Sequence, residues 1–416
     1  MKMDGVKGVG AGAEAAQFNF TAWESLTATM QPLLLNAISH PFKNCREDVS
    51  AAMVQFFGLT SSNASLFVPN HSKLLVSGFE ATFAGFTKHA RGEEGKKKYA
   101  AQDTLLRTLA HVIIHGDSEF YYEIVVTPLL RMVFDILDVY DSSTEDTEEN
   151  EKVKVKAEVE VEVEEVELEV EEEDKGEEEE VEEESNTKND KDIFNMARST
   201  LSFIARRCLI KVDNATQIVD NLIELVRSVI EGEGGKASWQ VRQAAIRFLG
   251  QFYATHLFLI SPDQTEQIRA LVVGLMGDKR REVSVSATSS FTVLLAAMSE
   301  EQCAKIVEEF AALAQKALRR KGKMLIAQAR ACNVLVASVL IRPYDVPKFV
   351  PVALGALAPH SFEKNAPPLV RQSVTKCISE FRRTHADNWA EHRLKFEISQ
   401  LETLDDSVSL TSNYYA

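Results

Sequence analysis

His385, His392 and Glu391 are the residues of this chain whose types and spacing come closest to a metal site. The two histidines lie two turns apart on a predicted helix, so they can share one face. A zinc site needs three or four ligands, and no third or fourth is evident. The sequence contains no HExxH, GxSxG, CxxC or Walker motif. We therefore predict surface or partly packed histidines, no metal, no cofactor, no catalytic residue and no enzymatic activity.

The cysteines predict neither a disulfide framework nor a zinc site. They are odd in number and lie far apart in apolar helical patterns: Cys45, Cys208, Cys303, Cys332 and Cys377. This usage is typical of reduced core cysteines in a nuclear or cytoplasmic protein. The N-terminus lacks the apolar core of a signal peptide, and no apolar run reaches the roughly 18 residues that span a bilayer. We therefore expect no membrane partner.

Two basic clusters are candidates for binding anions, Lys96–Lys98 and Arg319–Lys323. Such clusters serve nuclear import or bind phosphate-rich ligands, but short basic runs are also common in solvated turns. Aromatic residues that would stack on bases are not interleaved with these charges. We therefore predict no direct binding of nucleic acid.

The last seven residues, Leu410–Ala416, form a polar lead that ends in Tyr414, Tyr415 and the carboxylate of Ala416. Chain termini are normally solvated, so adjacent aromatic rings there gain nothing from folding unless a pocket receives them. The rings could pack back onto the last helix, or they could enter the pocket of a partner. We predict a flexible tail over 406–416 that docks on another assembly.

One acidic segment, 141–192, accounts for the low net charge of −16. It holds 26 acidic residues against 6 lysines, whereas the remainder holds 36 acidic and 40 basic residues and is mildly basic. Its valine and glutamate alternation is a strand pattern, but like charges on neighbouring strands oppose pairing. We predict a disordered low-complexity loop. The alternatives are a binding segment for histones or other basic partners and a transient intramolecular cover for the basic body.

Outside a Gly/Ala-rich flexible tail over 1–17 and this insert, apolar residues recur at helical spacing. We predict HEAT-like helices over 18–140 and a HEAT-repeat domain over 193–405. Five helices after the insert share an Arg or Ser at the centre of an apolar stretch, at intervals of 44, 42, 46 and 41 residues: Arg198, Arg242, Ser284, Arg330 and Arg371. Pairs of helices repeating at this spacing bury their apolar faces only against their neighbours. The expected fold is an all-α, HEAT/armadillo-like helical solenoid.

Local signals also predict where some helices begin. Ser261 with Gln264 and Ser299 with Gln302 fit the pattern of a capping box. Asp345 before Pro347 can start the helix that carries Phe349. A further helix is predicted over 71–89.

Several motifs carry a resemblance to one family. They are Pro343–Pro347 (PYDVP), Phe381–His392 (FRRTHADNWAEH), Phe396, Ser238–Arg242 (SWQVR) and, more weakly, His40–Arg46 (HPFKNCR). Together with the terminal tyrosines they closely resemble the C-terminal part of the proteasome activator complex subunit 4 family. The members are giant helical solenoids several times longer than this chain.

The resemblance implies a function in ubiquitin-independent proteolysis, and an association with DNA repair. Tyr414 would fill a hydrophobic position, Tyr415 would act on the gate, and the carboxylate of Ala416 would pair with a lysine between α subunits of the 20S proteasome. Some members carry a bromodomain-like region, which would overlap 239–300 here. The family's Asn-Phe pair falls at Met298-Ser299, so we do not carry acetyl-lysine recognition over.

Overall fold

The architecture of the protein comes from a computed structural model. The described residues are 20–61, 97, 99–108, 127, 130–138, 193–209, 215–232, 237–320, 323–363 and 366–412. The predicted N-terminal tail over 1–17, a helix predicted over 71–89 and the acidic insert over 141–192 lie outside them.

The described residues form helices and connecting turns, with none in a β-strand. Before the insert come α1 (Phe20–Ala37), α2 (Lys43–Ser61) and helical stretches over 99–108 and 130–138. After it come a helix over 193–207, α8 (Thr216–Glu231), α9 (Trp239–His256), η2 (Leu257–Leu259), α10 (Pro262–Leu275), α11 (Arg281–Ala296), α12 (Glu300–Arg319), α13 (Leu325–Leu340), α14 (Phe349–Leu357), α15 (Pro359–Phe362), α16 (Pro368–Thr384), α17 (Trp389–His392), η3 (Arg393–Lys395) and α18 (Ile398–Ser412). None of the helices in the described ranges is long and apolar enough to cross a bilayer.

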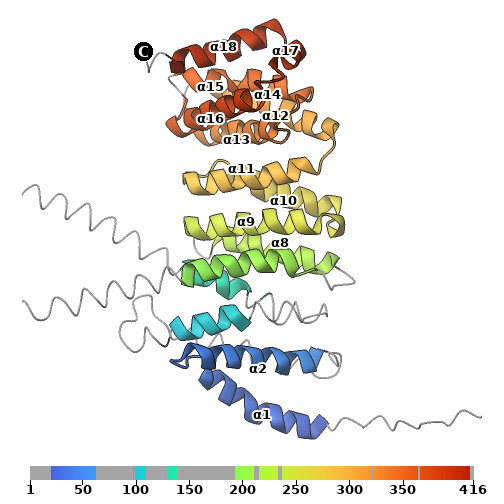
Figure 1. The fold of residues 1–416 in the computed structure, drawn as a ribbon, viewed down its shortest axis with the longest axis vertical. Helices are drawn as coiled ribbons and strands as arrows, with labels where there is room; N and C mark the ends of the chain where they lie inside the picture. The colour runs from blue at the N-terminus through green and yellow to red at the C-terminus, as the bar shows by residue number, and fades with distance from the viewer. Residues whose placement is uncertain are drawn as a thin grey trace, which may run out of the picture.

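The helices stack into an elongated column in two layers, with the N-terminal helices at one end and α18 at the other (Figure 1). In one layer α9 packs on α11, α11 on α13, and α13 on α16. In the other layer α8 packs on α10, α12 on α14, and α14 on α18. Successive helices pair across the layers, as α8 with α9 and α12 with α13. This arrangement is the predicted all-α solenoid, and four of the five repeat residues lie on α9, α11, α13 and α16 of one layer.

The helices on both sides of the acidic insert belong to one hydrophobic core. Phe134 precedes the insert and meets Phe248 of α9 edge to face, with ring centroids 6.3 Å apart. Phe252 stacks on Phe248 at 6.0 Å, and all three side chains are fully buried. The carboxylate of Asp138 accepts a hydrogen bond from the Ser238 backbone N–H at 3.0 Å. These contacts join the chain segments before and after the insert.

The starts of several helices match the local sequence signals. Ser261 and Ser299 each form a capping box, in which the serine hydroxyl accepts from the N–H three residues later and Gln264 or Gln302 bonds back. The prediction that Asp345 begins a helix before Pro347 is wrong. Its carboxylate accepts from the next backbone N–H, and α14 begins at Phe349.

Gly250 of α9 lies against Ser290 of α11. A Cβ atom built on Gly250 would lie 2.5 Å from Oγ and 2.8 Å from Cβ of Ser290. Overpacking of this kind costs about 1–3 kcal/mol, offset in part by about 1 kcal/mol of helix propensity. We therefore expect Gly250→Ala to lower the urea midpoint of unfolding. The matched control is Gly274→Ala in α10, where a new Cβ meets nothing within 4 Å and should raise the midpoint slightly. A destabilised Gly274→Ala together with an unchanged Gly250→Ala would contradict the packing.

His360 of α15 is fully buried and neutral. Its Nδ1 lies 3.0 Å from the side-chain amide nitrogen Nε2 of Gln328, which can only donate, so the ring nitrogen accepts. Burial lowers the pKa of His360 from 6.5 to about 4. A lowered histidine pKa gives stability that is complete above the unfolded value and is lost as the pH falls toward the folded value.

We therefore expect the unfolding free energy to fall by up to about 3 kcal/mol between pH 6.5 and 4 through His360 alone. Urea titrations across this range should show a flatter profile for His360→Asn than for the parent chain. Some slope remains in the variant, because burial also lowers the pKa of His256. Equal slopes in the two proteins would show that His360 does not titrate in this way.

Candidate functional site

The candidate site is the C-terminus, and α18 is the element that positions it. This helix packs on α14 and α15. Arg382 of α16 holds it from one side, donating to the carbonyl oxygen of Leu404 at 3.1 Å and to the carboxylate of Asp405 at 2.9 Å. Leu404 is buried in the shared core. The last turns of the chain therefore leave from a fixed base at the end of the column (Figure 1).

The predicted docking residues, Tyr414, Tyr415 and Ala416, lie outside the described residues. The backbone is helical through Ser412, whereas the sequence predicted a flexible tail from residue 406. The tail prediction differs from the structure at this boundary because α18 continues beyond its buried anchor at Leu404.

An aromatic cluster connects α16, α17 and the base of α18. Phe381 stacks on His385 with ring centroids 4.1 Å apart, and Trp389 and Phe396 meet Phe381 edge to face at 6.3 and 6.2 Å. His392 meets His385 at 5.1 Å. These contacts set the path of the chain from α16 into α18.

The prediction of surface or partly packed histidines is wrong for this pair. His385 is 2% and His392 8% exposed, because both rings complete the aromatic cluster. The Nδ1 of His385 donates to the carbonyl oxygen of Phe381 at 2.8 Å. Burial, followed by the nearby His385, lowers the pKa of His392. Within the described ranges no group of three His, Cys, Asp or Glu side chains has the arrangement of a metal site.

Four of the five cysteines are buried thiols, as predicted, but Cys45 of α2 is exposed. Burial raises the pKa of the Cys377 thiol to about 12, which disfavours the thiolate form that a nucleophilic cysteine needs. Of the basic clusters, Lys97 is exposed and its two neighbours lie outside the described residues. Arg319 and Arg320 are exposed where α12 ends.

Met298 and Ser299 are the positions that correspond to the family's Asn-Phe pair, and they lie where α12 begins. The hydroxyl and backbone N–H of Ser299 form the capping box of α12. Met298 packs half-buried against the core. Both residues are thus engaged in the turn between α11 and α12.

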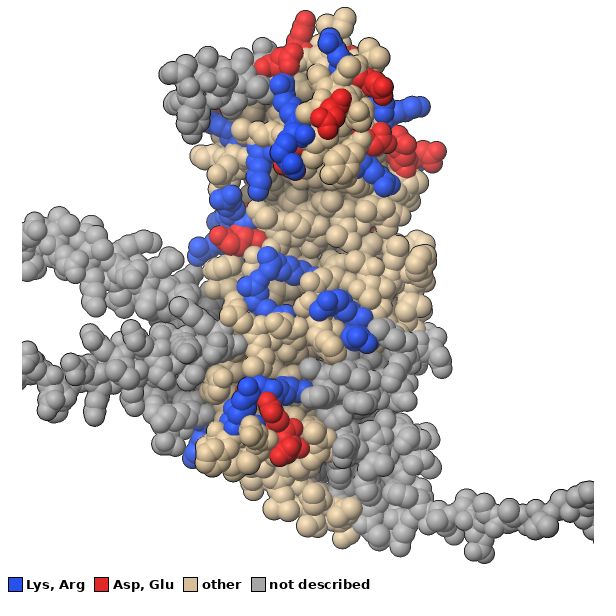
Figure 2. Space-filling model, in the orientation of Figure 1, with Lys and Arg blue, Asp and Glu red and all other residues tan. Residues whose placement is uncertain are grey.

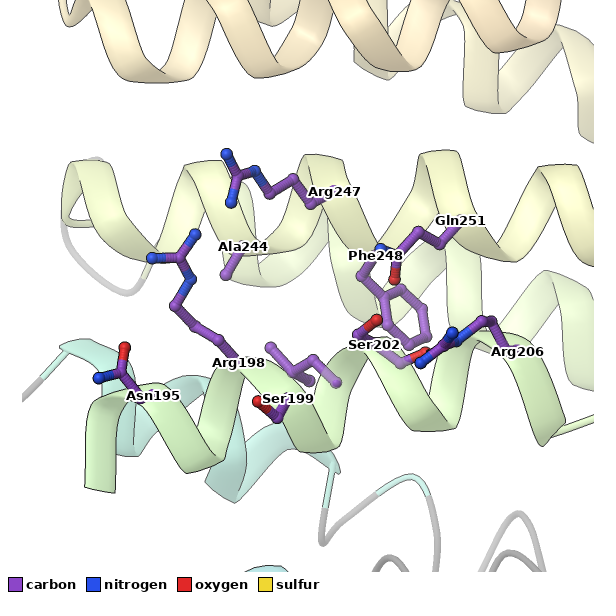
Figure 3. Close-up of a pocket in the computed structure, with 10 residues that line it drawn as sticks. Asn195, Arg198, Ser199, Ser202, Arg206, Ala244, Arg247, Phe248 and Gln251 are labelled. Atoms are coloured by element: carbon purple, nitrogen blue, oxygen red, sulfur yellow. The ribbon is translucent and has the colours of Figure 1, made fainter. Parts of the chain in front are cut away.

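A cavity of about 540 Å³ lies between the helix over 193–207 and α9, and sequence reasoning did not find it. Its lining includes three arginines, Arg198, Arg206 and Arg247, and none of its lining residues is acidic. Figure 3 shows Arg198 rising toward α9 on the side where Arg247 extends, with Arg206 at the other end beside Gln251. Arg198 was recognised only as a repeat residue. Arg206 lies on the same helix as Arg198 but belongs to no motif, and Arg247 joins them only because α9 packs beside this helix.

The comparisons with known proteins agree with the motifs. Residues 325–416 match the family model described as "Proteasome activator complex subunit 4-like, C-terminal". This chain is related to proteasome activator complex subunit 4. The matched region contains the aromatic cluster, α18 and the terminal tyrosines, and the relationship confirms the resemblance noted in the sequence.

Curated relatives with this name occur in animals and plants. The human protein is 31% identical over 209 residues, 47% of this chain and 11% of its own length. The Arabidopsis thaliana protein, proteasome activator subunit 4, is 30% identical over 201 residues, 47% of this chain and 11% of its own. The Xenopus laevis protein is 28% identical over 246 residues, 56% of this chain and 13% of its own. This chain therefore matches about an eighth of each relative's length.

Among solved structures, an engineered protein aligns with a TM-score of 0.31 at 12% identity, over 91% of this chain and 81% of that chain. A score this low carries no argument about the fold. The assignment of a solenoid rests on the layers and the repeat spacing described above.

Proposed function

We propose that this chain binds the α ring of the 20S proteasome through Tyr414, Tyr415 and Ala416 and promotes opening of the gate, without ATP or ubiquitin. The observation that supports the proposal most directly is the family match over residues 325–416, which includes these three residues. The curated relatives of this chain are named as proteasome activator subunits. In this proposal the chain is a regulator of another enzyme, in the nucleus and cytoplasm.

The base of the tail suits such a role. The aromatic cluster and the Arg382 contacts hold α18 against α14. A short segment leaving a rigid support loses less conformational freedom on docking than one leaving a mobile support. The tail then acts as a second, tethered contact beside the surface of the solenoid. Gate opening follows if the docked tyrosine binds the open ring better than the closed ring.

The proposed contact is with the ring and its gate, through the C-terminal region in which the family model matches this chain. The chain matches 11–13% of the relatives' length.

The test uses purified 20S proteasome, the full chain and a fluorogenic peptide. We expect the chain to raise the rate of peptide hydrolysis without added ATP, and to bind the proteasome in a pull-down. Binding without stimulation would support anchoring but not gate opening. Neither binding nor stimulation would overturn the proposal.

The charge of the insert favours a second candidate, an adaptor for basic cargo such as histones. With 26 acidic residues against 6 lysines, the segment over 141–192 would attract polycations. Such binding weakens steeply with salt, whereas docking by aromatic rings depends less on ionic strength. A salt titration of proteasome and histone binding therefore separates the two functions.

A further inference from the structure

The cavity between the helix over 193–207 and α9 concentrates positive charge that no described acidic side chain neutralises. Arg198, Arg206 and Arg247 make their described polar and ring contacts to neutral groups. Arg206 donates to the carbonyl oxygen of Ser202, Arg247 to the hydroxyl of Ser286, and the guanidinium of Arg198 lies over the ring of Phe194. Figure 2 shows basic side chains gathered near the middle of the column on this face.

The arginines lie close enough to disfavour one another's charge. Arg198 is half-buried, and its pKa is lowered first by burial and then by the nearby charge of Arg247. Two guanidinium groups that face one cavity without a counter-ion raise the free energy of the empty site. An anion between them would relieve that cost, and guanidinium groups bind carboxylates and phosphates through paired hydrogen bonds.

The shape of the site favours an extended ligand over a compact one. Arg198 and Arg206 are eight residues apart on one helix, which places their Cα atoms about 12 Å apart. Neutral hydrogen-bonding side chains line the path between and around them: Asn195, Ser199, Ser202 and Gln251. An extended peptide of about four residues spans this distance, and its backbone can pair with the neutral groups.

We propose that this cavity binds carboxylate groups of an acidic peptide. Arg198 and Arg247 would hold one carboxylate and Arg206 a second. The carboxylates can come from either of two sources. One is this chain's own acidic segment over 141–192, which ends directly before Ile193. The other is a Glu-rich segment of another protein. The inference is independent of the C-terminal tail and of proteasome binding.

The test measures binding of a fluorescently labelled Glu-rich peptide to the full chain by anisotropy at low salt. We expect the double variant Arg198→Gln, Arg247→Gln to bind about 10-fold to 100-fold more weakly. The matched control is the double variant Arg207→Gln, Arg319→Gln, which removes the same charge at arginines that do not line the cavity. It should change binding less than about 3-fold, as a general electrostatic effect does.

A second variant, with the glutamates of 158–184 replaced by glutamine, distinguishes the sources. Tighter peptide binding in this variant, lost again with the arginine substitutions, would show that the chain's own segment occupies the site. Unchanged binding that still depends on Arg198 and Arg247 would point to a partner's peptide. If the control variant weakened peptide binding as much as the cavity variant, the proposal would be overturned. The same holds if tripolyphosphate bound the cavity far more tightly than the peptide, because the site would then prefer phosphate to carboxylate.

Discussion

Removing Tyr415 and Ala416 should lower the affinity of this chain for the 20S proteasome by roughly 100-fold and abolish its stimulation of peptide hydrolysis. A charge-assisted contact of the terminal carboxylate contributes about 1.5–3 kcal/mol. Burial of one tyrosine ring contributes about as much. Ordering of the tail offsets part of this sum, so the net loss is about two factors of ten.

The measurement is a titration of proteasome peptidase activity with the full chain and with the truncated chain. Tyr344→Ala is a matched control, because Tyr344 belongs to the same C-terminal part and is 73% exposed. It should leave the affinity unchanged. Two further variants separate the ring from the carboxylate: Tyr415→Phe keeps the ring, and an added terminal glycine moves the carboxylate. Equal stimulation by the full and truncated chains would remove the tail from the mechanism.

The second large effect is expected at the ion pair that joins α9 to the turn before α11. Arg242 donates to both carboxylate oxygens of Asp278 at 2.9 and 3.0 Å, and also to the carbonyl oxygen of Ala237. The two side chains are 11% and 3% exposed. Asp278→Ala leaves the guanidinium buried without its counter-ion, which costs about 3–5 kcal/mol.

We expect this variant to unfold at a clearly lower temperature, as measured by circular dichroism at 222 nm. Glu224→Ala is the matched control. It removes an ion pair with Arg227 in which Glu224 is 68% exposed, and exposed pairs contribute only about 0.2–1 kcal/mol. If the two variants melted at the same temperature, the pair between α9 and α11 would not couple the repeats.

A similar buried ion pair lies near the N-terminal end of the column (Figure 1). Arg46 of α2 donates to Asp103 at 3.0 Å and to the carbonyl oxygens of His40 and Pro41. Arg46 and Asp103 are 6% and 2% exposed. In both places an arginine near a helix start binds the preceding connection and an acidic residue of a neighbouring segment. Each ion pair thereby fixes the position of one helix relative to a neighbouring segment.

Local signals account for much of what the sequence predicted correctly. The capping boxes at Ser261 and Ser299 form as predicted because each needs only a hydroxyl and an amide side chain three residues apart. The repeat spacing identified one layer because an apolar face must recur each time the chain returns to it. The family motif between Phe381 and Phe396 is likewise a contiguous stretch, and its aromatic residues meet one another.

The sequence did not predict the contacts between repeats. His385 is buried because its ring stacks on Phe381, and His392 is buried against His385. The polar side chains alone had suggested an exposed position for both. Cys45 lies in a pattern typical of the core but faces solvent. The Arg242–Asp278 pair joins residues 36 positions apart. The cavity brings Arg247 to Arg198 and Arg206, which precede it by 49 and 41 positions.

The sequence by itself determined the class of fold, the period of the repeats, the helix starts at the two serines and the relationship to the activator family. These depend on hydrogen bonds within one helical turn and on the recurrence of apolar residues. The tertiary structure alone decided which charges are paired, which are left facing a cavity, and where α18 is anchored. Those outcomes depend on how neighbouring helices cross and on the distance between them, and side-chain packing over the whole column sets both.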